Sequence, residues 1–98
     1  MTTTQRYVLN AFPEPPDETY GFELLGRLMP DGIGASRLYP TLERLEFHGW
    51  VAHRVEKPEE CEERPPRTMF YLTADGARWR LAERQRKPHA WPTPYASG

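Results

Sequence analysis

The chain has 98 residues, a single cysteine and a nearly balanced charge of −1, from 13 basic and 14 acidic side chains. One cysteine excludes an internal disulfide, and no apolar run approaches the roughly 18 residues that a membrane-spanning helix needs. The N-terminus also lacks the apolar core of a signal peptide. These features predict one small soluble domain in the cytoplasm, and they leave a nucleic-acid partner undecided.

Charge is distributed unevenly along the chain. Residues 56–63, EKPEECEE, hold five glutamates and one lysine, a local charge of −4. Residues 78–87, RWRLAERQRK, hold five basic groups and one glutamate, a local charge of +4. Such asymmetry either orients a protein on a charged partner or reflects two solvated surfaces.

The N-terminal half predicts three helices, because its apolar residues recur at three- and four-residue spacings. Their expected ranges are 4–12, 20–29 and Ala35 to about His48, with proline-rich or glycine-rich breaks at 13–18 and 30–34. Thr19 is the expected N-cap of the second helix, whose Leu24, Leu25 and Leu28 face inward.

The third helix contains a proline. Leu38, Leu42 and Leu45 form one apolar face, and Gly49 is the expected stop. With Gly34 as N-cap, Pro40 falls in the second turn, where the hydrogen bond that it removes lies near the helix end. We expect Pro40 to project from the outer side and to bend and stiffen the start of this helix.

The C-terminal half predicts a hairpin and a fourth helix. The β-branched and aromatic runs indicate strands, and the polar, proline-rich segment between them indicates a loop. The expected ranges are strands 50–57 and 68–73, loop 58–67, a helix 74–87 capped by Thr73, and an extended tail 88–98. Three helices, a two-stranded wing and a further helix define an α+β, mainly helical fold of the winged helix-turn-helix class. We expect residues 1–87 to form this domain.

Three segments resemble the PadR-like family of winged-helix transcriptional regulators. SRLYPTLERLEFHGWV is similar to the family's third-helix motif, and RPPRTMFYLTADGAR to its second motif. YGFELLGRL resembles the second-helix pattern, with Phe22 at the aromatic position. The resemblance covers roughly residues 5–83 and implies DNA binding, usually by a homodimer built on the terminal helices.

Three departures from the family pattern stand out. Glu43 occupies a position that is usually basic in the family. The wing, usually neutral or basic near its tip, is acidic here. The chain continues only a short way past the fourth helix, so we expect the ligand-sensing or dimerising extensions of longer relatives to be absent.

The outer side of the third helix holds the first candidate DNA contacts. Arginine reads guanine edges, and serine and threonine reach bases or phosphates. Tyr39 either packs at the edge of the core or reaches a phosphate. Glu43 repels a phosphate, accepts from a cytosine amino group, or pairs with a neighbouring arginine. The expected contacts in this helix are Ser36, Arg37, Tyr39, Thr41 and Arg44.

Two further arginines, Arg64 and Arg67, flank the paired prolines of the wing. They would bind backbone phosphates or enter the minor groove. The alternative is that they neutralise the adjacent glutamates.

The fourth helix is the expected dimerisation helix. Ala77 and Leu81 lie on one side of it and Trp79 on the other, where an outward tryptophan suggests a partner surface. We expect Trp79, Ala82 and Tyr7 to contribute to a dimer interface. The alternative is that Trp79 packs against the first helix of its own chain.

These patterns predict a sequence-specific DNA-binding regulator, a repressor that binds a two-fold related operator in double-stranded DNA as a homodimer. We expect no enzyme activity, cofactor or metal, since His48, His53 and Cys61 lack the spacing of zinc ligands. One alternative is a protein–protein interaction module, such as an antirepressor or adaptor, that uses the acidic wing 56–63 or the tail. Another is a mobile-element excision or architectural factor. The expected location is the cytoplasm, at the nucleoid when DNA is bound.

Overall fold

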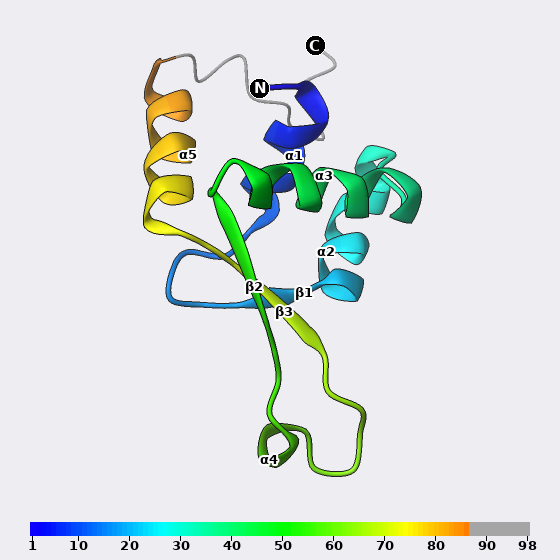
Figure 1. The fold of residues 1–98 in the computed structure, drawn as a ribbon. Coiled ribbons are helices and arrows are strands. Elements are labelled where there is room, and N and C mark those ends of the chain that lie inside the picture. The colour runs from blue at the N-terminus through cyan, green and yellow to red at the C-terminus, as the bar shows by residue number, and fades with distance from the viewer. Residues whose placement is uncertain (87–98) are drawn as a thin grey trace.

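The computed structural model describes residues 1–86, so the predicted tail 88–98 lies outside the described residues. The elements in chain order are α1 (Thr3–Ala11), β1 (Thr19–Tyr20), α2 (Gly21–Leu28), the 3-10 turn η1 (Met29–Asp31), α3 (Ala35–Phe47), β2 (Val51–Val55), α4 (Pro58–Cys61), β3 (Thr68–Leu72) and α5 (Ala74–Arg86). Figure 1 shows the hairpin of β2 and β3 projecting away from the helices, with α4 at its tip. The predicted α+β winged-helix class is confirmed.

The core lies between the first three helices and the base of the hairpin. Each helix contributes its apolar face, and the strands add Val51 and Leu72. The fully or almost fully buried leucines of the helices are Leu9, Leu24, Leu28, Leu38, Leu42 and Leu45. Burying such side chains is the main driving force that fixes the orientation of α3, since each contributes about 1.5–3 kcal/mol.

The sheet has three strands, in the order β1-β3-β2, where two were predicted. β1 is antiparallel to β3, with Thr19 opposite Phe70 and Tyr20 opposite Met69. Thr19 is therefore a buried strand residue and not the N-cap of α2; that cap is Tyr20. The Thr19 hydroxyl still contacts the first turn of α2, because it donates a hydrogen bond to Glu23 Oε1 at 2.6 Å.

The segment predicted as a loop, 58–67, begins with one turn of helix, α4. Pro58 occupies its first position, where a proline costs little because that amide needs no helical partner. Cys61 closes the turn and is buried, with its thiol donating to the Lys57 carbonyl oxygen at 3.1 Å. The wing tip thus contains a turn of helix, and the prediction of a loop over all of 58–67 was wrong at Pro58–Cys61.

α3 runs without interruption through Pro40, from the predicted N-cap Gly34. At its other end Gly49 has a φ of 80°, and the Trp50 amide donates to the Leu45 carbonyl at 3.0 Å. These are the features of a glycine-terminated helix, as expected. Whether Pro40 bends α3 stays a prediction.

The inner face of α5 is partly polar: Ala77 packs against the core, but Leu81, which was expected on the same side, does not. Leu81 is exposed, whereas Arg80 and Glu83 are buried. The Arg80 guanidinium donates to the carbonyl oxygens of Leu9, at 3.2 Å, and Phe12, at 2.7 Å. It thereby gives the Phe12 carbonyl, at the C-cap of α1, a donor, and it adds a second donor to the Leu9 carbonyl, which already accepts from the Phe12 amide at 3.4 Å. Periodicity predicts apolar inward residues, so it missed this arginine.

Candidate nucleic-acid interface

The outer face of α3 is the main candidate surface. Burial of Leu38, Leu42 and Leu45 on the inner face turns the opposite side of the helix to solvent. The exposed side chains of this outer face are Ser36, Arg37, Tyr39, Pro40, Glu43, Arg44 and Phe47. Four of the five predicted contacts in this helix, Ser36, Arg37, Tyr39 and Arg44, are thus exposed, and Thr41 is half-buried. That they contact DNA stays a prediction.

Two of these predicted contacts already have partners within the chain. Arg37 Nη2 donates to Thr4 Oγ1 of α1 at 3.0 Å, which directs its guanidinium toward α1. Thr41 is half-buried, and its hydroxyl donates to the Arg37 carbonyl oxygen at 2.7 Å. Arg37 keeps further donors for a ligand, whereas Thr41 retains chiefly its acceptor capacity.

Tyr39 and Arg67 meet across a hollow between α2, α3 and the wing. The hollow has a volume of about 420 Å³, and its lining also includes Phe22 and Thr68. The Arg67 guanidinium lies over the Tyr20 ring, 4.3 Å from its centroid, so it is held at the start of α2. Gly21 makes room for this arrangement, since a Cβ there would lie 2.5 Å from the Tyr39 hydroxyl.

Arg64 lies away from this hollow and faces Glu56. Its two terminal nitrogens donate to the Glu56 carboxylate at 2.7 and 3.0 Å, a bidentate pair. The hydrogen bond from Arg64, helped by one from the Arg67 amide, lowers the pKa of Glu56 to about 2. In this structure Arg64 therefore neutralises a glutamate, the second of its two predicted roles.

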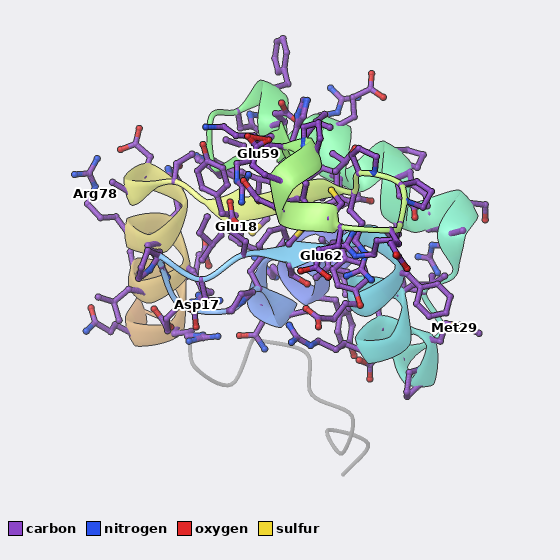
Figure 2. The ribbon with its side chains drawn as sticks, turned by 90° about the horizontal axis from the view of Figure 1, so that it is seen from below. Asp17, Glu18, Met29, Glu59, Glu62 and Arg78 are labelled. Carbon is purple, nitrogen blue, oxygen red and sulfur yellow. The ribbon has the colours of Figure 1, made fainter. Side chains whose placement is uncertain are left out.

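The wing tip remains acidic after its ion pairs are counted. Arg54 binds Glu18 and Glu60 together, with distances of 2.7 Å to Glu18 and 3.1 Å to Glu60. Three further glutamates, Glu59, Glu62 and Glu63, are exposed and form no ion pair within residues 1–86. Figure 2 shows Glu59 and Glu62 on the wing tip. A negative tip would repel phosphates.

The predicted dimer residues lie on or near α5. Trp79 is 44% exposed and stacks obliquely on Trp50, with 5.0 Å between ring centroids. Trp79 and Ala82 line the same shallow hollow, of about 450 Å³, while Tyr7 packs against the core from α1. Trp79 therefore packs on the segment before β2, and much of its ring stays open.

Sequence reasoning gave no role to two exposed phenylalanines. Phe47, at the end of α3, is 82% exposed, and Phe22, in the first turn of α2, is 78% exposed. The helical period already places Phe47 opposite the leucines, so that signal was present for Phe47. For Phe22 the apolar character of the side chain masked its outward position.

Within residues 1–86 no three histidine, cysteine or acidic side chains come together as metal ligands would. Nor does this part of the chain contain a helix long and apolar enough to cross a membrane.

The helix pair α2–α3, followed by a β-hairpin wing and a C-terminal helix, defines a winged helix-turn-helix protein. The profile described as the transcriptional regulator PadR-like family matches residues 8–82, most of the chain. The chain therefore belongs to the PadR-like family of transcriptional regulators, and it is a regulator and not an enzyme.

Solved structures agree with this fold. A PadR family regulator from Eggerthella lenta is 27% identical, with a TM-score of 0.65, over 86% of this chain and 70% of that one. The protein smu.1704 from Streptococcus mutans is 19% identical, with a TM-score of 0.71, over 89% and 79%. PadR from Bacillus subtilis, solved in complex with operator DNA, is 17% identical, with a TM-score of 0.66, over 83% of this chain and 47% of its own length. No curated protein matches the chain.

Proposed function

We propose that the chain is a sequence-specific DNA-binding repressor that binds a two-fold related operator as a homodimer. The observation that carries this proposal is the outer face of α3. This helix is the second of the helix-turn-helix pair, its leucine face is buried, and its opposite face carries exposed polar side chains. Such a helix enters the major groove, and PadR of Bacillus subtilis was solved with operator DNA.

The hollow beside Arg67 supports a contact with the DNA backbone next to that helix. Arg67 supplies a positive charge to the lining of this hollow, and Tyr39 and Thr68 supply hydroxyl groups. Phosphate contacts of this kind position a protein on the duplex without reading its sequence. The first turn of α3 contains no acidic residue, so its free amides would also favour a phosphate.

The acidic tip restricts how the wing takes part. The base of the wing carries Arg67, whereas the tip carries Glu59, Glu62 and Glu63. We infer that the base approaches a phosphate and that the tip stays away from the duplex.

The dimer would form through α5. Trp79 and Ala82 leave an apolar surface open on this helix, and exposed tryptophans often contribute much of the binding energy at interfaces. Two copies related by a two-fold axis would present two α3 helices to two half-sites.

Salt-dependent DNA titration tests the proposal. A duplex selected from a random library by the full chain is titrated at several salt concentrations, with wild type, Arg67→Ala and Arg37→Ala. Affinity should fall linearly on a log–log plot against salt, and Arg67→Ala should reduce the slope by about one. Arg78→Ala removes an exposed arginine of α5 and should leave the slope unchanged.

Absence of binding at low salt would reject the proposal, as would binding that is indifferent both to salt and to the Arg67 and Arg37 substitutions. The acidic tip would then favour a second function, an adaptor whose wing binds a basic protein. A stoichiometric partner that survives nuclease treatment would support that function.

A further inference from the structure

The outermost line of α3 is apolar at two positions seven residues apart. Pro40 and Phe47 are both exposed, and together with Glu43 and Arg44 they line a shallow hollow of about 320 Å³. Phe47 is the most exposed of the large hydrophobic side chains in residues 1–86, at 82%. Apolar side chains in such a position gain free energy when a partner covers them.

The charges around this hollow cancel. Glu43 and Arg44 form its charged walls, and neither makes an ion pair within the described chain. Arg37, the other arginine of this helix, is directed toward Thr4 and away from the line. Arg44 therefore remains the arginine of α3 that can read a guanine beside the line Ser36–Pro40–Glu43–Phe47.

The chemistry of the major groove identifies an apolar group that fits this line. Each base pair presents donors and acceptors there, and thymine alone adds a methyl group, on C5, which apolar side chains contact. Glu43, between the two apolar residues, can accept a hydrogen bond from the amino group of a cytosine.

We infer that Pro40 and Phe47 recognise the C5-methyl groups of operator thymines, an inference that rests on the proposed DNA binding by α3. Seven residues of helix rise about 10 Å, so the two contacts would lie at most about three base pairs apart. These methyl contacts then add to any base contact of Arg44, with Glu43 selecting a cytosine between them.

Replacing thymine by deoxyuridine tests this inference, because it removes the methyl group and keeps the base pair. Single dT→dU changes are made at each thymine of the duplex that the full chain selects, and dissociation constants are measured. At one or two positions of each half-site we expect binding to weaken about three- to fivefold, the value of one buried methyl group. For each thymine, the dissociation constant of the dU duplex divided by that of the dT duplex gives a U/T ratio. Phe47→Ala and Pro40→Ala should each bring this ratio toward one at the thymine that the replaced side chain contacts.

The control variant is Met29→Ala, which removes an exposed apolar side chain of η1 and should keep the wild-type ratios. Because Pro40 and Phe47 are exposed, their substitution should leave the fold intact, which circular dichroism checks. A ratio of one at every thymine, or a motif without thymine, would overturn the inference while leaving DNA binding in place. Ratios that persist in both alanine variants would also overturn it. Failure to bind any duplex would instead reject the proposed function itself.

Discussion

The backbone of Gly76, in the first turn of α5, packs against the backbone of Trp50, just after the turn that ends α3. The Thr73 hydroxyl accepts from the Gly76 amide at 3.0 Å and donates to the Gly49 carbonyl at 2.6 Å. This double contact brings the α5 backbone against Trp50 so closely that a Cβ on Gly76 would lie 1.9 Å from the Trp50 carbonyl oxygen. The contact is between backbone atoms, so no rotation of a side chain can relieve it.

Gly76→Ala should therefore destabilise the fold by about 1–3 kcal/mol, the usual cost of overpacking. Gly26→Ala is the matched control, because nothing lies within 4 Å of a Cβ there. That substitution should stabilise α2 by about 0.5–1 kcal/mol through its effect on the unfolded chain. Urea unfolding of both variants measures the difference. Equal stabilities would show that the turn shifts freely to accept the methyl group.

Among the elements, the wing depends most on its ion pairs. Glu56 accepts from both nitrogens of the Arg64 fork and from the Arg67 amide, which closes the loop around α4. Arg54 ties the same unit to Glu18, in the connection between α1 and β1. The wing tip thus keeps its shape through charged contacts around the single buried side chain of Cys61.

The pH dependence of stability should reflect Glu56. Its pKa is lowered from 4.5 to about 2 by the hydrogen bond from Arg64. The unfolded chain therefore binds more protons than the folded chain between these values, so stability is present above pH 4.5 and is lost as the pH falls toward 2. Melting temperatures of wild type and Glu56→Gln, measured from pH 6 to 2, should converge in this window.

The pKa of Glu18 is also lowered, because Arg54 donates a hydrogen bond to its carboxylate. The Glu56→Gln variant should therefore still lose some stability in acid. Parallel curves for the two proteins across the window would contradict the role of Glu56.

The long elements could be predicted from the sequence because each carries a period or a terminal signal of its own. α3 shows its leucine face and its glycine ends, and the Thr73 hydroxyl accepts from the Gly76 amide in the first turn of α5, as expected of a cap. β1 has two residues, too few to show a period, and it exists because β3 offers it an edge. α4 is a single turn of four residues, too short to show a helical period.

The candidate site likewise has one part that the sequence could predict and another that depends on tertiary structure. The outer face of α3 follows from the helical period alone. The Arg64–Glu56 ion pair and the position of the Arg67 guanidinium over the Tyr20 ring depend on how the wing packs against α2. Sequence spacing treats Arg64 and Arg67 alike, whereas the fold gives them different partners.

At the scale of the whole molecule, two arginines attach the C-terminal end of α1 to the neighbouring helices α2 and α5. Arg27 of α2 donates to the Ala11 carbonyl at 2.9 Å, and Arg80 of α5 donates to those of Leu9 and Phe12. α5 is thus attached to the body by polar contacts as well as by the packing of Ala77 against the core. Its apolar Trp79 and Leu81 remain exposed, which suits a helix that binds a second copy.

The proposed dimer predicts the effect of a charge on this helix. Ala82→Glu should convert a dimer into a monomer in sedimentation velocity, because it buries an unpaired carboxylate at the interface. Met29→Glu is the control, since Met29 and α5 lie on opposite sides of the molecule (Figure 2). A monomeric wild type, or a dimer that tolerates Ala82→Glu, would contradict an interface at this position.

The folded acidic wing tip has a consequence for the search along a genome. Every stretch of duplex offers phosphates, so a regulator with a basic wing is held by a vast excess of irrelevant sites. Glu59, Glu62 and Glu63 oppose that capture equally at every sequence, since they act on the backbone charge. Binding at the operator would then depend more on base contacts, because the backbone contributes less to the affinity. The acids of the wing would thus lower its occupancy of irrelevant DNA and leave more molecules free to find the operator.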